Sequence, residues 1–298
     1  MATRFNPNIL PELLVDLQTA QQSAQTAAQE VSTGRSVNAP GDNPAAVAAL
    51  VLNDAQTSED AQFQTNISDL QSKLQVANSV MSNASQLLTS AISLGTEGAT
   101  GTESASERQA IATQVAGLQQ QMLALANTTY QGTYIFSGTN VTTQAFTADS
   151  SAPSGVVYNG NSAVNSVQIS EGESLQTNLP GSQVFMSSSG NAFGALNDLV
   201  NALNSGTGIA AATTEVQNAF NEINSQGAFY GNALSQLTNA ESYLSQDTVN
   251  LSTQQNSLVG ANLTQAVSDL SQDETDEQAS ESATAQILQL PTILDYIQ

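Results

Sequence analysis

The sequence predicts a mainly α-helical protein with a small β insert, in which the N- and C-terminal regions form an elongated antiparallel helical bundle or coiled coil. Apolar residues recur at a heptad-like spacing over long stretches towards both ends of the chain, as is typical of packed helices. The middle of the chain carries short β-type runs between turn residues. Aromatic residues make up only 5% of the composition, which suits long helices packed side by side.

The first helix is expected from about Ile9 to Gly34, with Asn8 as a cap and Pro11 in the first turn, where its missing N–H does little harm. Its apolar positions are separated mostly by three or four residues, which indicates one apolar face. The positions are Ile9, Leu13, Leu17, Ala20, Ala24, Ala27 and Val31.

A turn should follow at residues 38–44, where Pro and Gly are dense, and a second long helix should start at Pro44 with Asn43 or Asp42 as its cap. The glycines of segment 95–101 should end this helix. Its heptad-like seam is held over about 50 residues, beyond the usual length of a globular helix. The seam contains Phe63, Ile67, Leu70, Leu74, Ala77, Met81, Ala84, Leu88 and Ala91.

A third helix is expected from about Glu103 to Asn127. Between Gly132 and about Ser189 the composition changes to Gly, Asn, Ser and Thr, with short β-type runs and turn signals such as residues 159–161. This segment indicates a small β domain or a set of hairpins inserted between helices. The runs are Thr133–Phe136, Gly155–Tyr158 and Ser166–Ile169.

Helix should return at about Ala192 and be interrupted at residues 206–208. A further stretch is expected over Ile209–Ile223, and a last, very long helical region from Ala228 towards the C-terminus. Pro291 should kink or end that helix, because proline removes a backbone hydrogen bond.

This order predicts three nested domains. Residues 1–40 and 262–298 would form a terminal helical assembly domain, residues 41–136 and 190–261 a rod of long helices, and residues 137–189 the inserted β domain. Because both chain ends carry apolar seams, we expect the ends to pair with each other or with further copies of the chain.

Composition excludes several classes of function. The chain has no Cys and no His, so it cannot form disulfides, thiolate zinc sites or histidine-based catalytic triads. We therefore expect no enzyme activity, no catalytic residues, no metal and no cofactor. A net charge of −22 with only 4 basic residues makes nucleic acid and anionic membranes poor partners.

Neither a membrane helix nor a cleavable signal peptide is expected. The longest apolar run, Ala45–Leu52, is far short of a membrane span, and the N-terminus lacks the pattern of a secretory leader. These features predict a soluble chain. At this point a cytoplasmic location and export by a route without a cleaved signal both stay open.

Three segments resemble the bacterial flagellin family. Residues 32–45, STGRSVNAPGDNPA, resemble the N-terminal segment of flagellins and their relatives. Residues 130–139, YQGTYIFSGT, are similar to an element of the hook–filament junction proteins of this family, as is the ending over Ile287–Leu290 and Leu294–Ile297. Two departures are Pro291, where the family usually continues its helix, and Asn43, where Asp is commoner.

The resemblance implies a flagellin-like fold and a structural subunit of the bacterial flagellum that connects hook to filament. It would be an extracellular protein exported by the type III apparatus without a cleaved signal peptide. Implied partners are other copies of the chain, an adjacent hook-associated junction protein, flagellin and an export chaperone. The alternative is flagellin itself, the filament subunit. A type III translocator would need a long apolar segment that this chain lacks.

The residues expected to carry assembly are apolar seam positions at the two ends, together with one cation. The seams would form surfaces between subunits, although an ordinary core within one chain would also use them. Arg35 either pairs with an acidic residue such as Asp273 or Glu277, or is a solvated charge at a helix end. The expected assembly residues are Ile9, Leu13, Leu17, Arg35, Leu290, Ile293, Leu294 and Ile297.

Two other charged features favour ordinary roles. The acidic cluster between Asp269 and Glu281 lacks the glycine and oxygen-ligand spacing of a calcium loop, so a solvated helix face is expected. Lys73 is the only lysine. No partners for a catalytic amine accompany it, so we expect a surface lysine whose stem lies along the helix.

Overall fold

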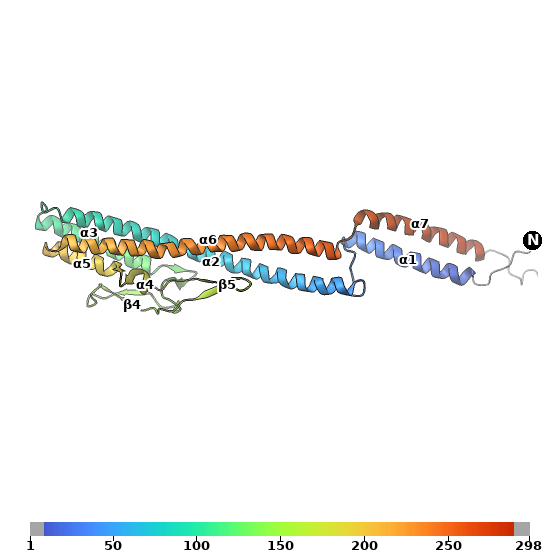
Figure 1. Cartoon of the computed structure of the whole chain (residues 1–298), viewed down its shortest axis with the longest axis horizontal. Helices are drawn as coiled ribbons and strands as arrows, with labels where there is room; N and C mark the ends of the chain where they lie inside the picture. The colour runs from blue at the N-terminus through green and yellow to red at the C-terminus, as the bar shows by residue number, and fades with distance from the viewer. Residues whose placement is uncertain (1–8, 289–298) are drawn as a thin grey trace, which may run out of the picture. The chain divides into compact units, whose positions relative to one another are not determined.

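Figure 1 shows the computed structural model, which describes residues 9–288. Within this range it contains seven α-helices and eight short β-strands, a helical bundle with a small β insert, as the sequence predicted. The helices are α1 (Ile9–Thr33), α2 (Pro44–Gly98), α3 (Ala105–Ala126), α4 (Gly181–Phe185), α5 (Ala192–Ser205), α6 (Ile209–Val259) and α7 (Leu263–Leu288).

The described residues form two compact units. Unit 1 contains the residues up to Ser58 and those from Asp247 onwards, and unit 2 is Glu59–Gln246. Helices α1 and α7 lie in unit 1, whereas α3, α4, α5 and the strands lie in unit 2. The long helices α2 and α6 contribute residues to both units.

Unit 2 is built on the antiparallel packing of α2 against α6. Gln71 donates to Glu241 at 2.9 Å, and Ser85 donates to Asn224 at 2.6 Å. Residue numbers therefore increase along α2 as they decrease along α6, which shows that the two helices are antiparallel. The predicted seam of α2 is confirmed, since all of its residues are buried. They are Phe63, Ile67, Leu70, Leu74, Ala77, Met81, Ala84, Leu88 and Ala91.

The structure corrects the expected division of the C-terminal helices. Helix α6 is continuous through Gly227, where the sequence predicted a break after Ile223. A glycine inside a helix costs only about 1 kcal/mol, and buried positions on both sides of Gly227, such as Val216 and Leu237, outweigh that cost. The real break falls at residues 260–262, between α6 and α7.

Helices α3 and α5 pack against each other beside the α2–α6 pair (Figure 1). The end of α2 at Gly98 lies inside the predicted breaker segment. A Cβ at Gly95 would meet the side chain of Thr213, and one at Gly98 would meet Leu203. These two glycines therefore allow α5 and α6 to approach the last turns of α2 closely.

The β insert consists of four separate antiparallel hairpins, which agrees with the second of the two forms expected from the sequence. Each pairs two consecutive strands. The strands are β1 (Thr129–Tyr130), β2 (Thr133–Tyr134), β3 (Phe146–Ala148), β4 (Val156–Tyr158), β5 (Ser166–Ser170), β6 (Glu173–Gln176), β7 (Met186–Ser187) and β8 (Gly190–Asn191).

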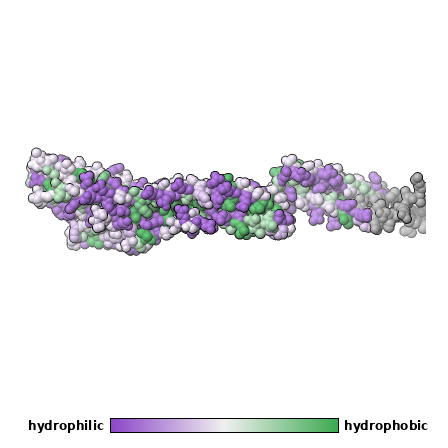
Figure 2. Space-filling model, viewed as in Figure 1, coloured by the Kyte–Doolittle hydropathy of each residue, from purple (hydrophilic) through white to green (hydrophobic). Residues whose placement is uncertain are grey.

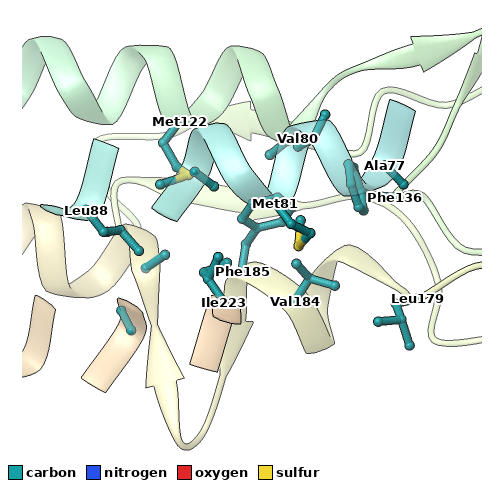
Figure 3. Packing of buried hydrophobic residues seen from close by; sticks show 14 of the residues in the cluster. Ala77, Val80, Met81, Leu88, Met122, Phe136, Leu179, Val184, Phe185 and Ile223 are labelled. Carbon is teal, nitrogen blue, oxygen red and sulfur yellow. The ribbon is translucent and has the colours of Figure 1, made fainter. Parts of the chain in front are cut away.

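A cluster of phenylalanine rings lies under these hairpins. Phe136 and Phe185 meet edge to face with ring centroids 5.2 Å apart, and Phe146 lies 5.2 Å from Phe193. All four rings are fully buried. Figure 3 shows Phe185 close to Met81 of α2 and Phe136 close to Ala77 of the same helix, within the buried cluster that also contains Met122 of α3. The few aromatic residues are therefore concentrated where short strands and helix ends need bulky side chains to fill the core.

Segment 137–139 is held by segment 159–161. Asn161 accepts a hydrogen bond from the backbone of Thr139 at 2.9 Å and donates its own backbone N–H to Ser137 at 3.1 Å. Gly138 has a φ of +74°, and a Cβ there would collide with the backbone and side-chain oxygens of Asn161. Glycine is thus required by both conformation and space.

Helix α3 begins with a capping box. The backbone N–H of Ser104 donates to the Glu107 carboxylate at 2.7 Å, and the N–H of Glu107 donates to the Ser104 hydroxyl at 3.3 Å. The hydrogen bonds from Ser104 hold the pKa of Glu107 below its ordinary value.

We expect Gly138→Ala to lower the free energy of unfolding by about 3 kcal/mol, because it adds a collision to an unfavourable φ. Gly172→Ala is the matched control, since Gly172 has the same φ of +74° and nothing within 4 Å of an added Cβ. It should cost about 1 kcal/mol. Urea unfolding of both variants measures the difference, and equal losses would contradict the role of Asn161.

The capping box should also make stability depend on pH. The folded-state pKa of Glu107 is depressed, so its contribution is present above the pKa of the unfolded chain and is lost as the pH falls through the folded-state pKa. Glu107→Gln should therefore destabilise the protein at pH 7 and have less effect at acidic pH.

Thermal unfolding at several pH values tests this expectation. Glu215→Gln is the control, because Glu215 is an exposed acid on α6 whose side chain has no hydrogen bond within residues 9–288. A Glu107→Gln effect that stays constant with pH would contradict the expectation.

Candidate assembly interface

The two helices nearest the chain ends pack as an antiparallel pair in unit 1. Helices α1 and α7 lie side by side (Figure 1). Gln21 of α1 donates to Glu277 of α7 at 3.0 Å, which sets one point of the register. Nearer the other end of the pair, Ala27 and Ala266 are both buried. Their small side chains allow the two helices to approach closely.

The C-terminal end of α1 is joined by backbone hydrogen bonds to the connection between α6 and α7. The N–H of Ser36 donates to Val259 at 2.8 Å, and the N–H of Ala261 donates to Gly34 at 3.0 Å. Between these bonds Arg35 and Gly260 form an antiparallel bridge. Gly34, with a φ of +70°, ends α1 in the left-handed conformation that favours glycine.

The segment that follows is a closed turn whose residues have separate roles. The Asp42 carboxylate accepts backbone N–H bonds from Ala39 at 2.7 Å and Asn38 at 2.9 Å, and these bonds hold the pKa of Asp42 below its ordinary value. Asn43 instead caps α2, since its side-chain oxygen accepts the N–H of Ala46 at 3.1 Å. The structure thus decides between the two caps that the sequence allowed.

The parts of α2 and α6 in unit 1 meet through a polar contact. Asn53 of α2 is buried, and its amide donates to the carbonyl of Leu251 at 3.0 Å and to the side chain of Gln254 at 3.1 Å. A buried amide with satisfied hydrogen bonds fixes helix register at a cost in stability.

Within the described part of unit 1, every buried apolar side chain is small. They are Ala27, Ala46, Val259 and Ala266. Several larger apolar side chains are exposed, including Leu52 at 73% and Val15 and Val51 at 61%. Figure 2 shows hydrophobic surface over the first turns of α2. Unit 1 therefore presents apolar surface that its own described residues do not cover, as is typical of an interaction site.

Four of the eight sequence-predicted assembly residues lie wholly or partly within the described chain. Leu17 is half-buried on α1. Ile9 and Leu13 belong to α1, but their side chains lie outside the described residues. Arg35 is described and exposed. The other four expected assembly residues lie outside the described residues, and they are Leu290, Ile293, Leu294 and Ile297. The predicted cap Asn8 and the predicted helix breaker Pro291 also lie outside them.

The expected ion pair of Arg35 is not formed within the chain, at least across residues 9–288. Arg35 lies beside Gly260, whereas Glu277 lies several helical turns away, beside Gln21. Asp273 lies between these two levels on α7. The antiparallel register separates the partners, which the spacing in sequence could not reveal.

Sequence reasoning missed several exposed apolar residues of unit 1. A detectable signal existed, because residues 45–52 form the longest apolar run of the chain and include Val51 and Leu52. A run this dense covers more than one face of a helix, so part of it must be exposed. The other large exposed residues in the described part of unit 1 are Leu14, Val15, Val249, Leu263 and Val267.

Residues 9–288 contain no group of three or more acidic side chains placed to hold a metal ion. No helix in this range is both long and apolar enough to cross a membrane.

Comparison with known proteins shows which family models match this chain. The model of the bacterial flagellin N-terminal helical region matches residues 12–141, and that of the bacterial flagellin C-terminal helical region matches residues 213–297. The first match includes α2, α3 and most of α1, and the second includes most of α6 and all of α7.

Three relatives illustrate the similarity. The chain is 31% identical over 166 residues to flagellar hook-associated protein 3 of Escherichia coli K12, which covers 55% of this chain and 50% of that protein. The protein of the same name from Salmonella typhimurium LT2 is 30% identical over the same shares of both chains. The structure of the flagellar junction protein FlgL from Legionella pneumophila superposes with a TM-score of 0.61 at 17% identity, covering 71% of this chain and 100% of that one.

The chain spans about half the length of the curated relatives that it matches. The structural similarity, at its low identity, supports the fold. The two family models together match well over half of the residues, one at each end of the chain. This chain belongs to the bacterial flagellin family.

Proposed function

We propose that this protein is a structural subunit of the bacterial flagellum that connects the hook to the filament. It would be built into the axial structure through unit 1 and act without catalysis or a cofactor. The location would be extracellular, after type III export without a cleaved signal peptide.

The observation that carries the proposal is the contrast between the two units. Unit 2 buries large side chains such as Phe63, Leu74 and Leu88, whereas the described part of unit 1 buries only small ones and exposes Leu52 and Val51. Each square ångström of apolar surface that a neighbouring subunit covers stabilises the assembly by about 25 cal/mol. Unit 1 is therefore suited to bury its apolar surface against other subunits.

Relatives support the junction role more specifically. Two similar proteins are named flagellar hook-associated protein 3, and a solved structure with the same fold is named a flagellar junction protein. The same family also contains filament flagellins, so the filament subunit is the second candidate. The two roles differ in copy number and in whether the protein extends a filament by itself.

Partners and contact residues follow from this proposal. Copies of the chain, an adjacent hook-associated protein and flagellin would contact it, and a chaperone would hold it before export. Residues 1–40 and 262–298 would form the assembly domain, with residues 41–136 and 190–261 as the rod and 137–189 as the β insert. Arg35, exposed in the structure, would pair with an acidic residue of a neighbouring subunit.

Electron microscopy of cells that lack this protein tests the junction role. We expect hooks without filaments and flagellin released into the medium, because the filament would have nothing to grow from. Filaments attached to hooks in the mutant would contradict the proposal. Long filaments grown from purified protein on short seeds would favour the flagellin alternative.

Leu52→Asn should impair assembly without unfolding the protein, because the side chain is 73% exposed and its proposed contacts lie in other subunits. We expect the protein concentration needed for incorporation onto hooks to rise about tenfold, which corresponds to losing the burial of one leucine. Incorporation is measured by sedimentation with isolated hooks, and folding by circular dichroism.

Val164→Asn is the matched control for this variant. Val164 is a 51% exposed valine in the β insert of unit 2, so its replacement removes exposed apolar surface outside the proposed interface. It should incorporate normally. Equal impairment of both variants would indicate a general effect of surface polarity and would count against an interface on unit 1.

A further inference from the structure

Lys73 lies in a groove of unit 2 and not on an open helix face. The groove has a volume of about 320 Å³ and is bounded by α2 and by the hairpins β1–β2 and β5–β6. Helix α2 contributes Asn66, Asp69 and Lys73 to its wall. The hairpins contribute Tyr130 and Val167, and Thr177 follows directly after β6. Lys73 is half-buried, since the β insert covers part of its side chain.

The ammonium of Lys73 loses solvent without gaining a counter-ion. Burial lowers the pKa of Lys73, and within residues 9–288 its side chain makes neither an ion pair nor a hydrogen bond. Asp69 stands one helical turn away but does not pair with it. The side chain is half-buried, so part of it stays open to solvent and to an incoming group.

The other half-buried cation of the described chain is explained by the fold. Arg108 donates to the carbonyl of Glu103 at 2.8 Å, and its guanidinium lies against Gly206, at the C-terminal end of α5. A cation at the C-terminal end of a helix interacts favourably with the helix dipole. Lys73 has no such structural role, although the chain has only 4 basic residues against 26 acidic ones.

We propose that this groove receives an Asp or Glu carboxylate from a second copy of the chain, which pairs with Lys73 when copies assemble. The inference rests on the proposed function, since it requires several copies packed together. An incoming copy presents many exposed carboxylates, including Glu171 and Glu173 at the tip of the β5–β6 hairpin.

The walls of the groove favour such a pair. Its space is sufficient for one side chain. Tyr130 and Val167 provide apolar surface in the same groove, so an ion pair formed there is less screened than a fully exposed one. Each pair would also remove one negative charge from the repulsion between copies that carry a net charge of −22 each.

The single lysine makes the test specific. A water-soluble carbodiimide condenses a paired amine and carboxylate into an amide and takes up the lost oxygen as a urea. In assembled full-length protein we expect an amide from Lys73 to a carboxylate of another copy, identified by mass spectrometry of the linked peptides. Coupling at the α-amino group gives a different peptide. Unassembled protein should give no linked dimer.

Two variants separate the effect of the positive charge of Lys73 from that of its reactive amine. Lys73→Arg keeps the cation, so it should assemble normally but give no amide under the same treatment. Lys73→Gln removes the cation and should raise the concentration needed for assembly about fivefold, the effect of one partly shielded ion pair. Arg35→Gln removes the cation proposed to pair in unit 1, so it should weaken assembly, but the subunits that do assemble should still couple at Lys73.

Other outcomes would overturn the inference. Assembled protein without an intermolecular amide at Lys73, or with coupling only to Asp69 of the same chain, would overturn it and leave the proposed function intact. In a further outcome, acetate added to unassembled protein protects Lys73 from an amine-acylating reagent, and no coupling between copies is found. That result would assign the groove to a free carboxylate. Failure of the full-length protein to incorporate onto hooks would overturn the proposed function itself.

Discussion

The packing of α2 against α6 in unit 2 is the interaction on which the rest of that unit depends. Leu74, Ala77 and Leu88 of α2 and Val216 and Leu237 of α6 are almost completely buried. Burial of this kind is the main favourable contribution to folding, and side chains spaced along two long helices extend it over many turns. Helices α3 and α5 and the hairpins all pack onto this pair, so their positions follow from its register.

Unit 1 has the same kind of secondary structure but a different balance of forces. Its described helices meet through alanines, a hydrogen bond between Gln21 and Glu277, and the amide of Asn53. Such contacts set register but remove little apolar surface from water, and a helix pair of this kind is only marginally stable by itself. Small buried side chains and exposed residues such as Leu52 are two consequences of one composition, and both fit the proposed role of unit 1 as a contact surface for other subunits.

Two of the three segments that resemble flagellin-family patterns have structural roles that explain their residue types. In the N-terminal segment, Gly34 ends a helix, Asp42 closes a turn through two backbone N–H groups, and Asn43 starts the next helix. In the second segment, Phe136 anchors the ring cluster and Gly138 admits Asn161. These roles are local and steric, so each allows very few residue types. They explain how short motifs could identify the family while saying little about the contacts between subunits.

The sequence by itself determined the elements whose physics is local or periodic. The seam from Phe63 to Ala91, the turn before Pro44 and the change to hairpins after Gly132 could be predicted, because helix periodicity and turn chemistry depend on neighbouring residues. Tertiary structure decided the rest. Helix α6 continues through Gly227 because buried contacts on both sides outweigh one glycine. The register of α1 on α7 separates Arg35 from Glu277, and hairpins distant in sequence enclose Lys73. Each of these outcomes depends on which segments meet across the fold, and spacing along a single chain does not contain that information.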